Sequence, residues 1–321
     1  MINIEQLSRS FGAIRAVQDL SFTVERGEVL GFLGPNGAGK STTMRLITGF
    51  LPPSAGRISV GGHDVVEAPL AAKRLMGYLP ENAASYPDMS VHGFLQFAAE
   101  MRGLSGEAKK KAVNRVVELC FLDAVLYQQI DTLSKGYKHR TCLAQALIHD
   151  PQVLVMDEPT DGLDPNQKHE VRNLIREMGK TKAVIFSTHI LEEVDAACSR
   201  AIIIDRGRIV ANGTPAELKG MSELAGAVML AATGADASKL AALPVAAKVE
   251  ALDAGGFRVY PKEKGASAEL TRSIMELVGR EGWKIAALRT EEGHLDEVFR
   301  RITMPDTIAA PANAPQTPAG A

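Results

Sequence analysis

The residues with the clearest chemistry form a glycine-rich run from Gly34 to Ser41, which has the pattern G-x-x-x-x-G-K-S. It follows an apolar stretch, Val29 to Leu33, that is typical of a buried strand, and a helical pattern starts near Ser41. Glycines let successive backbone N–H groups surround phosphate oxygens, a helix N-terminus adds positive charge, and Lys40 can reach the β and γ phosphates. The run therefore predicts a nucleotide site in which the Ser41 hydroxyl binds Mg²⁺. The expected nucleotide contacts are Gly34, Asn36, Gly37, Ala38, Gly39, Lys40, Ser41 and Thr42.

A pair of neighbouring carboxylates, Asp157 and Glu158, follows the apolar run Val153 to Met156. Side chains alternate along a strand, so the two carboxylates point in different directions. Asp157 can then hold Mg²⁺ while Glu158 faces an attacking water as a general base, as phosphoryl transfer requires. On its own the pair could be a solvated acidic turn, but together with the glycine-rich loop it indicates an NTP-hydrolysing site.

The stretch Leu133-Ser134-Lys135-Gly136-Tyr137 lies ahead of the Asp157–Glu158 pair. This order of motifs resembles the ATP-binding cassette (ABC) ATPases that power ABC transporters, and the resemblance covers residues 1 to about 220. It implies a P-loop NTPase cassette that hydrolyses ATP with Mg²⁺. It also implies a homodimer of cassettes packed head to tail, in which Ser134 and the Gly136 N–H of one subunit contact the γ-phosphate held by the other.

Three further positions take their expected roles from the same resemblance. Phe11 would stack on adenine, His189 would touch the γ-phosphate, and Asp164, in Asp161-Gly-Leu-Asp164, would belong to the loop that couples the two sites. Taken alone, Phe11 fits a core or turn aromatic and His189 a solvated loop residue. Ser134 and Gly136 alone would indicate a helix N-terminus. The order of the motifs favours the functional roles.

Some residues depart from the family pattern. Glu81 stands where the family usually has glutamine, Tyr137 replaces the usual glutamine after the signature, and Asp161 stands where serine is commoner. With the ending Leu295-Asp-Glu-Val-Phe299, these features resemble the branch that serves separate export permeases, including gliding-motility and multidrug-like systems. We expect Glu81 to approach the Mg²⁺ directly or through water. The alternative is that Glu81 faces a basic patch on the permease.

Hydrophobic patterning predicts an α/β fold for residues 1–220, with a largely parallel sheet. Strand signals disappear between about residues 90 and 150, where two runs of apolar residues at helical spacing indicate a helical insertion. A later helix is expected to begin at Asp164, with Pro165 in its first turn. The expected strands are Ile2 to Leu7, Val29 to Leu33, Arg57 to Val60, Met76 to Leu79, Val153 to Met156, Ala183 to Ser187 and Ala201 to Ile204.

Residues 221–304 have a different character and predict a small accessory α+β domain, either a stabilising or dimerising appendage or a regulatory one. Residues 305–321 are rich in proline and alanine and predict a disordered tail. The expected strands of the small domain are Leu224 to Ala231, Lys248 to Asp253, Phe257 to Pro261 and Trp283 to Leu288, with helices near Ala268 to Val278 and Leu295 to Ile302.

Composition limits the remaining choices. The 36 basic and 38 acidic residues give a net charge of −2, so nothing favours general binding to nucleic acid or anionic membranes. The longest uncharged run of interest, Leu224 to Ala235, is far shorter than the ~20 apolar residues of a membrane span. We therefore expect a cytoplasmic protein, attached peripherally to the membrane through separately encoded permease subunits. The rival functions are an ABC ATPase that acts on ribosomes or DNA and a nucleotide-sensing regulatory module.

Overall fold

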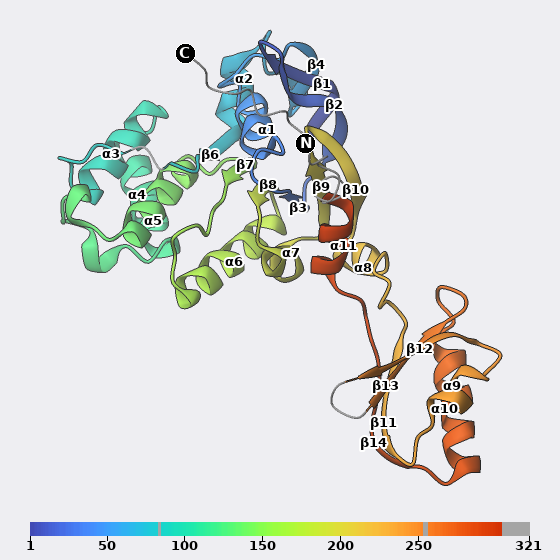
Figure 1. Ribbon diagram of the computed structural model, residues 1–321. Helices are drawn as coiled ribbons and strands as arrows, with labels where there is room; N and C mark the ends of the chain where they lie inside the picture. Colours follow the sequence, from blue (N-terminus) through green and yellow to red (C-terminus); the bar gives the residue numbers. More distant parts are fainter. Residues whose placement is uncertain (83–84, 253–255, 304–321) are drawn as a thin grey trace, which may run out of the picture. The chain divides into compact units, whose positions relative to one another are not determined.

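The computed structural model describes residues 1–82, 85–252 and 256–303, and the chain divides into two compact units, Met1–Pro215 and Ala216–Ala321 (Figure 1). The sequence placed this boundary near residue 220. The expected disordered tail, residues 305–321, lies outside the described residues.

A six-stranded sheet in the order β10-β9-β3-β8-β7-β6 forms the centre of the first unit (Figure 1). All its strand pairs are parallel except β9 with β10. Because β3, β8 and β7 are parallel neighbours, the residues that follow them meet at one edge of the sheet. The strands are β3 (Val29–Leu33), β6 (Met76–Leu79), β7 (Val153–Asp157), β8 (Ala183–Thr188), β9 (Arg200–Asp205) and β10 (Arg208–Gly213).

Both faces of this sheet are covered, as the continuous apolar runs of β7 and β8 require. Val153 and Val155 share one core with helix α1 (Lys40–Ile47). The intervening Leu154 and Met156 share a second core with α5 (Lys135–Leu147) and α6 (Pro165–Gly179). Since side chains alternate along a strand, the two cores lie on opposite faces of the sheet.

A second sheet in the first unit, β2-β1-β4-β5, is antiparallel throughout. The expectation that Ile2 to Leu7 and Arg57 to Val60 join a largely parallel sheet was therefore wrong. Both strands are buried on one side only, and such half-buried strands are typical of antiparallel pairing. The strands are β1 (Ile2–Phe11), β2 (Ile14–Val24), β4 (Ala55–Val60) and β5 (His63–Asp64); β2, β5 and the edge strand β10 were not predicted.

The predicted helical insertion is confirmed by α3 (Val91–Met101), α4 (Gly106–Leu119) and α5, which Figure 1 shows grouped together. Ser90 caps α3, because its hydroxyl accepts a hydrogen bond from the Gly93 N–H. The apolar positions that predicted these helices are all buried: Val91, Phe94, Leu95, Ala98, Val113, Val116, Val117 and Cys120. The remaining helices of this unit are α2 (Pro69–Leu75) and α7 (Leu191–Ala197), with 3₁₀ turns at Asp123–Val125 and Ile130–Thr132.

The second unit contains an antiparallel sheet in the order β12-β13-β11-β14, which confirms the predicted α+β character. Two helices pack on this sheet around a core that includes Val228, Leu230, Val259, Leu270 and Ile274. Its strands are β11 (Val228–Thr233), β12 (Ala246–Leu252), β13 (Gly256–Pro261) and β14 (Lys284–Thr290), and the helices that pack on them are α9 (Ala237–Ala241), which was not predicted, and α10 (Ser267–Glu281). Helix α8 (Pro215–Lys219) lies at the start of this unit and α11 (Leu295–Thr303) at the end of the residues described for it.

Candidate functional site

The glycine-rich loop connects the end of β3 to the start of α1, as its sequence predicted. Gly39 caps α1 with φ 108°, and a Cβ at this position would lie 2.4 Å from the Ala16 carbonyl oxygen, so only glycine fits. Lys40 is 6% exposed and folds back over the loop, where its Nζ donates to the Gly34 carbonyl oxygen at 2.8 Å. The loop and the first N–H groups of α1 thus form a cradle for an anion.

A polar pocket of about 320 Å³ opens over this loop. Glu81 and Glu158 lie in its wall, so acidic groups from two separate segments face the anion cradle. Ala16 and Pro35 also line it, which the sequence did not indicate. The lining residues from the predicted loop are Asn36, Gly37, Gly39, Lys40, Ser41 and Thr42.

Asp157 ends β7 and connects the loop to the sheet. Its Oδ1 accepts hydrogen bonds from Ser41 Oγ at 3.0 Å and from Ser187 Oγ. Its Oδ2 is fully buried and has no hydrogen-bond partner within the described part of the chain. A buried carboxylate oxygen needs a donor or a cation. The Ser41 hydroxyl and the Asp157 carboxylate are hard oxygen ligands, so this pair fits a Mg²⁺ ion that completes its shell with water and phosphate oxygens.

Glu158 and His189 follow the neighbouring strands β7 and β8 and meet across the edge of the sheet. His189 Nδ1 lies 2.9 Å from Glu158 Oε2. Glu158 has a φ of 52°, a left-handed conformation that costs a non-glycine residue ~1 kcal/mol or more. Its N–H donates to Ser187 Oγ at 3.0 Å, which holds that conformation in place. A strained residue aimed at a polar pocket indicates a functional position.

Burial and the neighbouring charges shift the pKa of Glu158 in opposite directions. Burial raises the pKa of its carboxyl, while Lys40 and His189 lower it. Lys40 Nζ lies 3.5 Å from Glu158 Oε1, so the carboxylate has a cation on one side and an imidazole on the other. A carboxylate whose pKa is raised by burial is a stronger proton acceptor, as long as it stays ionised.

Three further predicted site residues lie at the starts of two other helices. Ser134 and Gly136 stand at the N-terminus of α5, and Asp164 caps α6 by accepting from the Gln167 N–H at 2.9 Å. A Cβ at Gly136 would lie 2.4 Å from Gln167 Oε1, so the two helix N-termini approach closely at this glycine. Within the described residues, none of Ser134, Gly136 and Asp164 lines the polar pocket.

Phe11 ends β1 and also does not line the polar pocket. It is 44% exposed, and the Arg9 guanidinium lies 4.7 Å from the centre of its ring. An exposed ring with a cation on its face can still stack on a planar base from its other face.

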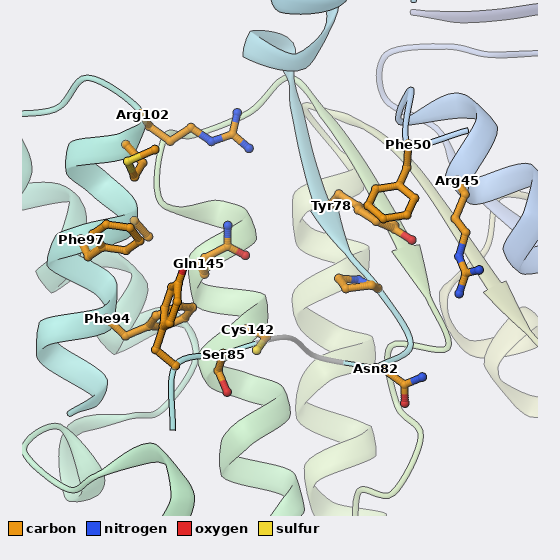
Figure 2. Close-up of a pocket in the computed structure, with 14 residues that line it drawn as sticks. Arg45, Phe50, Tyr78, Asn82, Ser85, Phe94, Phe97, Arg102, Cys142 and Gln145 are labelled. Carbon is orange, nitrogen blue, oxygen red and sulfur yellow. The ribbon is translucent and has the colours of Figure 1, made fainter. Parts of the chain in front are cut away.

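A second pocket of about 820 Å³ lies beside the helical insertion, and Figure 2 shows its residues. Phe94 and Phe97 come from α3, Cys142 and Gln145 from α5, and Tyr78 from β6. The Tyr86 ring makes edge contacts with both phenylalanines, at centroid distances of 6.2 and 5.5 Å. The sequence did not indicate this pocket, because its residues come from segments that are far apart in the chain.

Residues 17–161 match the family model described as ABC transporter. The linearmycin resistance ATP-binding protein LnrL of Bacillus subtilis (strain 168) is 33% identical over 308 residues, which cover 94% of this chain and 98% of that protein. The Nod factor export ATP-binding protein I of Rhizobium sp. (strain N33) is 34% identical over 303 residues, 94% of this chain and 96% of that protein. A solved structure of an ATP binding subunit of an ABC transporter has 30% identity and a TM-score of 0.64, covering 68% of this chain and 92% of that one.

Fold, site and sequence thus define an ATPase of the P-loop cassette class. The chain belongs to the family of ABC transporter ATP-binding proteins, and the predicted family, fold class and ATPase activity are confirmed. None of the helices in the described ranges combines the length and the apolar composition that a membrane span needs.

Proposed function

We propose that this protein is the ATPase subunit of an exporter, and that it works as a head-to-tail homodimer bound to separate membrane permease subunits. The observation that carries this proposal is the meeting of Lys40, Asp157, Glu158 and His189 at one edge of the sheet. The names of the two relatives that match over nearly their whole length, one for linearmycin resistance and one for Nod factor export, support outward transport. Attachment on the cytoplasmic side of the membrane, through the permease, follows from this proposal.

In the proposed reaction, the loop N–H groups and Lys40 bind the β and γ phosphates of ATP. Lys40 then exchanges part of its contact with Glu158 for phosphate oxygens. Glu158 accepts a proton from the attacking water. With a proton on each ring nitrogen, His189 donates from Nδ1 to Glu158 and from Nε2 to the γ-phosphate. Ser41 and Asp157, with Glu81 close by, would hold Mg²⁺, which when bound neutralises charge on the phosphates.

The proposed dimer is supported by predicted site residues that do not line the nucleotide pocket of their own subunit. Ser134 and Gly136 are placed at the N-terminus of a 13-residue helix, α5, and within the described residues neither lines the pocket over the phosphate loop of its own subunit. A second copy placed head to tail would bring this helix terminus to the γ-phosphate, where its N–H groups favour negative charge. Phe11 would stack on the adenine of the nucleotide held by its own subunit.

The large pocket beside α3 is where we propose that the permease binds. Its lining includes five aromatic side chains, and Phe50, Tyr86 and Met101 expose apolar surface there. Pockets of this size and character are typical sites for an apolar anchor of a partner. Pro80 and Asn82 line this pocket while Glu81 lines the nucleotide pocket, so one short segment faces both.

The test is the oligomeric state of Glu158→Gln. The variant keeps the shape of the side chain and removes the base, so hydrolysis should slow by a factor on the order of 10²–10³ and Mg-ATP should accumulate in the closed dimer. Sedimentation should show a dimer with Mg-ATP and a monomer without it. Adding Ser134→Arg to the same variant should abolish the dimer, because a bulky side chain then meets the partner's phosphate site. A monomer under all conditions would contradict the head-to-tail arrangement.

A further inference from the structure

Glu193, on α7, is a buried carboxylate that the proposed reaction does not use. It is 1% exposed, and both of its carboxylate oxygens are hydrogen-bonded. Oε1 accepts from the Thr160 hydroxyl, and Oε2 accepts from the Thr188 hydroxyl at 2.7 Å. Thr160 and Thr188 are themselves buried. Charged side chains are rarely buried unless their position serves a purpose, because burial of a carboxylate carries a large desolvation cost.

The two threonines belong to the two segments that carry the reactive pair. Thr160 lies two residues after Glu158, and Thr188 ends β8 directly before His189. Thr188 Oγ1 also accepts from the Ile190 N–H at 3.0 Å, which holds the chain on the other side of His189. Glu193 therefore connects the segment after β7, which carries Glu158, with the end of β8, which His189 follows.

The hydrogen bonds of Glu193 add to one that the backbone of Glu158 itself makes. The Glu158 N–H donates to Ser187 Oγ on β8. Two residues further along the chain, the Thr160 hydroxyl donates to Glu193. Hydrogen bonds therefore hold the chain on both sides of Glu158 and on both sides of His189. A carboxylate suits this place because its two oxygens accept from two hydroxyls at once. A glutamine would present its N–H₂ group to one of the two threonine hydroxyls. That hydroxyl would then have to accept a hydrogen bond and could no longer donate one to residue 193.

We propose that Glu193 is a positioning residue, which sets the separation of Glu158 and His189 through its hydrogen bonds to Thr160 and Thr188. The inference rests on the proposed roles of Glu158 and His189. Small displacements of groups that act on a transition state lower the rate of the chemical step more than they weaken ground-state binding.

The experiment measures kcat and KM for ATP hydrolysis by the full-length chain. Glu193→Gln should lower kcat by about tenfold or more and change KM by less than about threefold. Glu192→Gln, an exposed neighbour on α7, is the matched control and should behave as the wild type. Thr160→Val should reproduce the loss of kcat, and Thr160→Ser should restore it because serine keeps the hydroxyl. If Glu193→Gln does not fold, the comparison of Thr160→Val with Thr160→Ser still tests whether this hydrogen bond affects kcat.

A double-mutant cycle separates positioning from a merely structural role. Single-turnover hydrolysis is measured for Glu193→Gln, His189→Ala and the double variant. If Glu193 acts through the Glu158–His189 contact, the double variant should be no slower than His189→Ala within about threefold. Equal fold losses from Glu193→Gln in both backgrounds, or wild-type kcat in both Glu193→Gln and Thr160→Val, would overturn the inference and leave the proposed function standing. Wild-type hydrolysis by Glu158→Gln would instead contradict the proposed function itself.

Discussion

Two of the pockets in the first unit differ in almost every respect. The nucleotide pocket is small, about 320 Å³, and is built from backbone N–H groups, a lysine and carboxylates. The second pocket is about 820 Å³ and exposes mostly apolar surface, although Arg45 and Arg102 also line it. The first therefore suits a compact anion that must be held in one geometry, and the second suits an apolar segment of a partner.

The difference shows two ways of building specificity. In the nucleotide pocket, the polar groups are held by the fold before any ligand arrives: Glu158 is tied to Ser187, and Ser41 to Asp157. Such preorganised polar groups can stabilise a transition state without rearrangement. In the second pocket, affinity depends on apolar area and on how well side chains repack. A change in one pocket should therefore leave the chemistry of the other intact.

The largest expected effect comes from Lys40→Ala. This change removes the cation that faces both the loop carbonyls and Glu158, so hydrolysis should fall by a factor on the order of 10²–10³. Binding to the permease, measured by copurification, should stay within about twofold because no residue of the large pocket changes. Strong loss of copurification would show that the two pockets cannot be separated in this way.

A smaller effect is expected from Met101→Glu in the large pocket. Met101 is 72% exposed, so the charge should not unfold α3, but it should weaken permease binding by about tenfold or more. Hydrolysis by the isolated chain should change by less than about twofold. Leu70→Glu is the matched control, since Leu70 is 74% exposed on α2 and does not line this pocket. Equal weakening by both variants would place the permease elsewhere.

The same contrast decides what the sequence can predict. The phosphate loop is a continuous run. Asp157 ends β7, and Glu158 and His189 directly follow β7 and β8, which are adjacent and parallel. Local pattern and strand order therefore bring them together. The large pocket joins residues from Arg45 to Gln145 that share no motif, so only the packed structure reveals it. Glu193 was missed for a related reason, because nothing in its local pattern marks a carboxylate as buried.

The fold shows the same limit. Fully buried strands such as β7 and β8 are clear from their apolar runs, and the helical insertion from its spacing. The antiparallel sheet was misassigned because β1 and β4 were recognised, whereas β2, which pairs with β1, and β5, which pairs with β4, were not predicted. β2 contains an aspartate at Asp19 with φ 52°, and β1 pairs with it through several register shifts. Such irregular pairing weakens the alternation on which strand prediction depends.

The smallest expected effect is at Glu81, where the two pockets meet. Glu81 lines the nucleotide pocket together with Lys40 and Ser41, whereas Pro80 and Asn82 on either side line the larger one. A carboxylate near the Ser41–Asp157 oxygens adds favourable charge for Mg²⁺, which prefers anionic and water oxygens. Glu81→Gln removes that charge and keeps the shape.

We therefore expect Glu81→Gln to raise the Mg²⁺ concentration for half-maximal hydrolysis by about two- to fivefold, since one charge interaction of an exposed side chain contributes little more than ~1 kcal/mol. Glu67→Gln, an exposed carboxylate outside the nucleotide pocket, is the control and should leave the titration unchanged. The alternative assigns Glu81 to the permease. In that case the Mg²⁺ titration of the isolated chain would stay the same while transport by the assembled complex is lost. Because the segment faces both pockets, measuring both quantities on the same variant determines which pocket Glu81 serves.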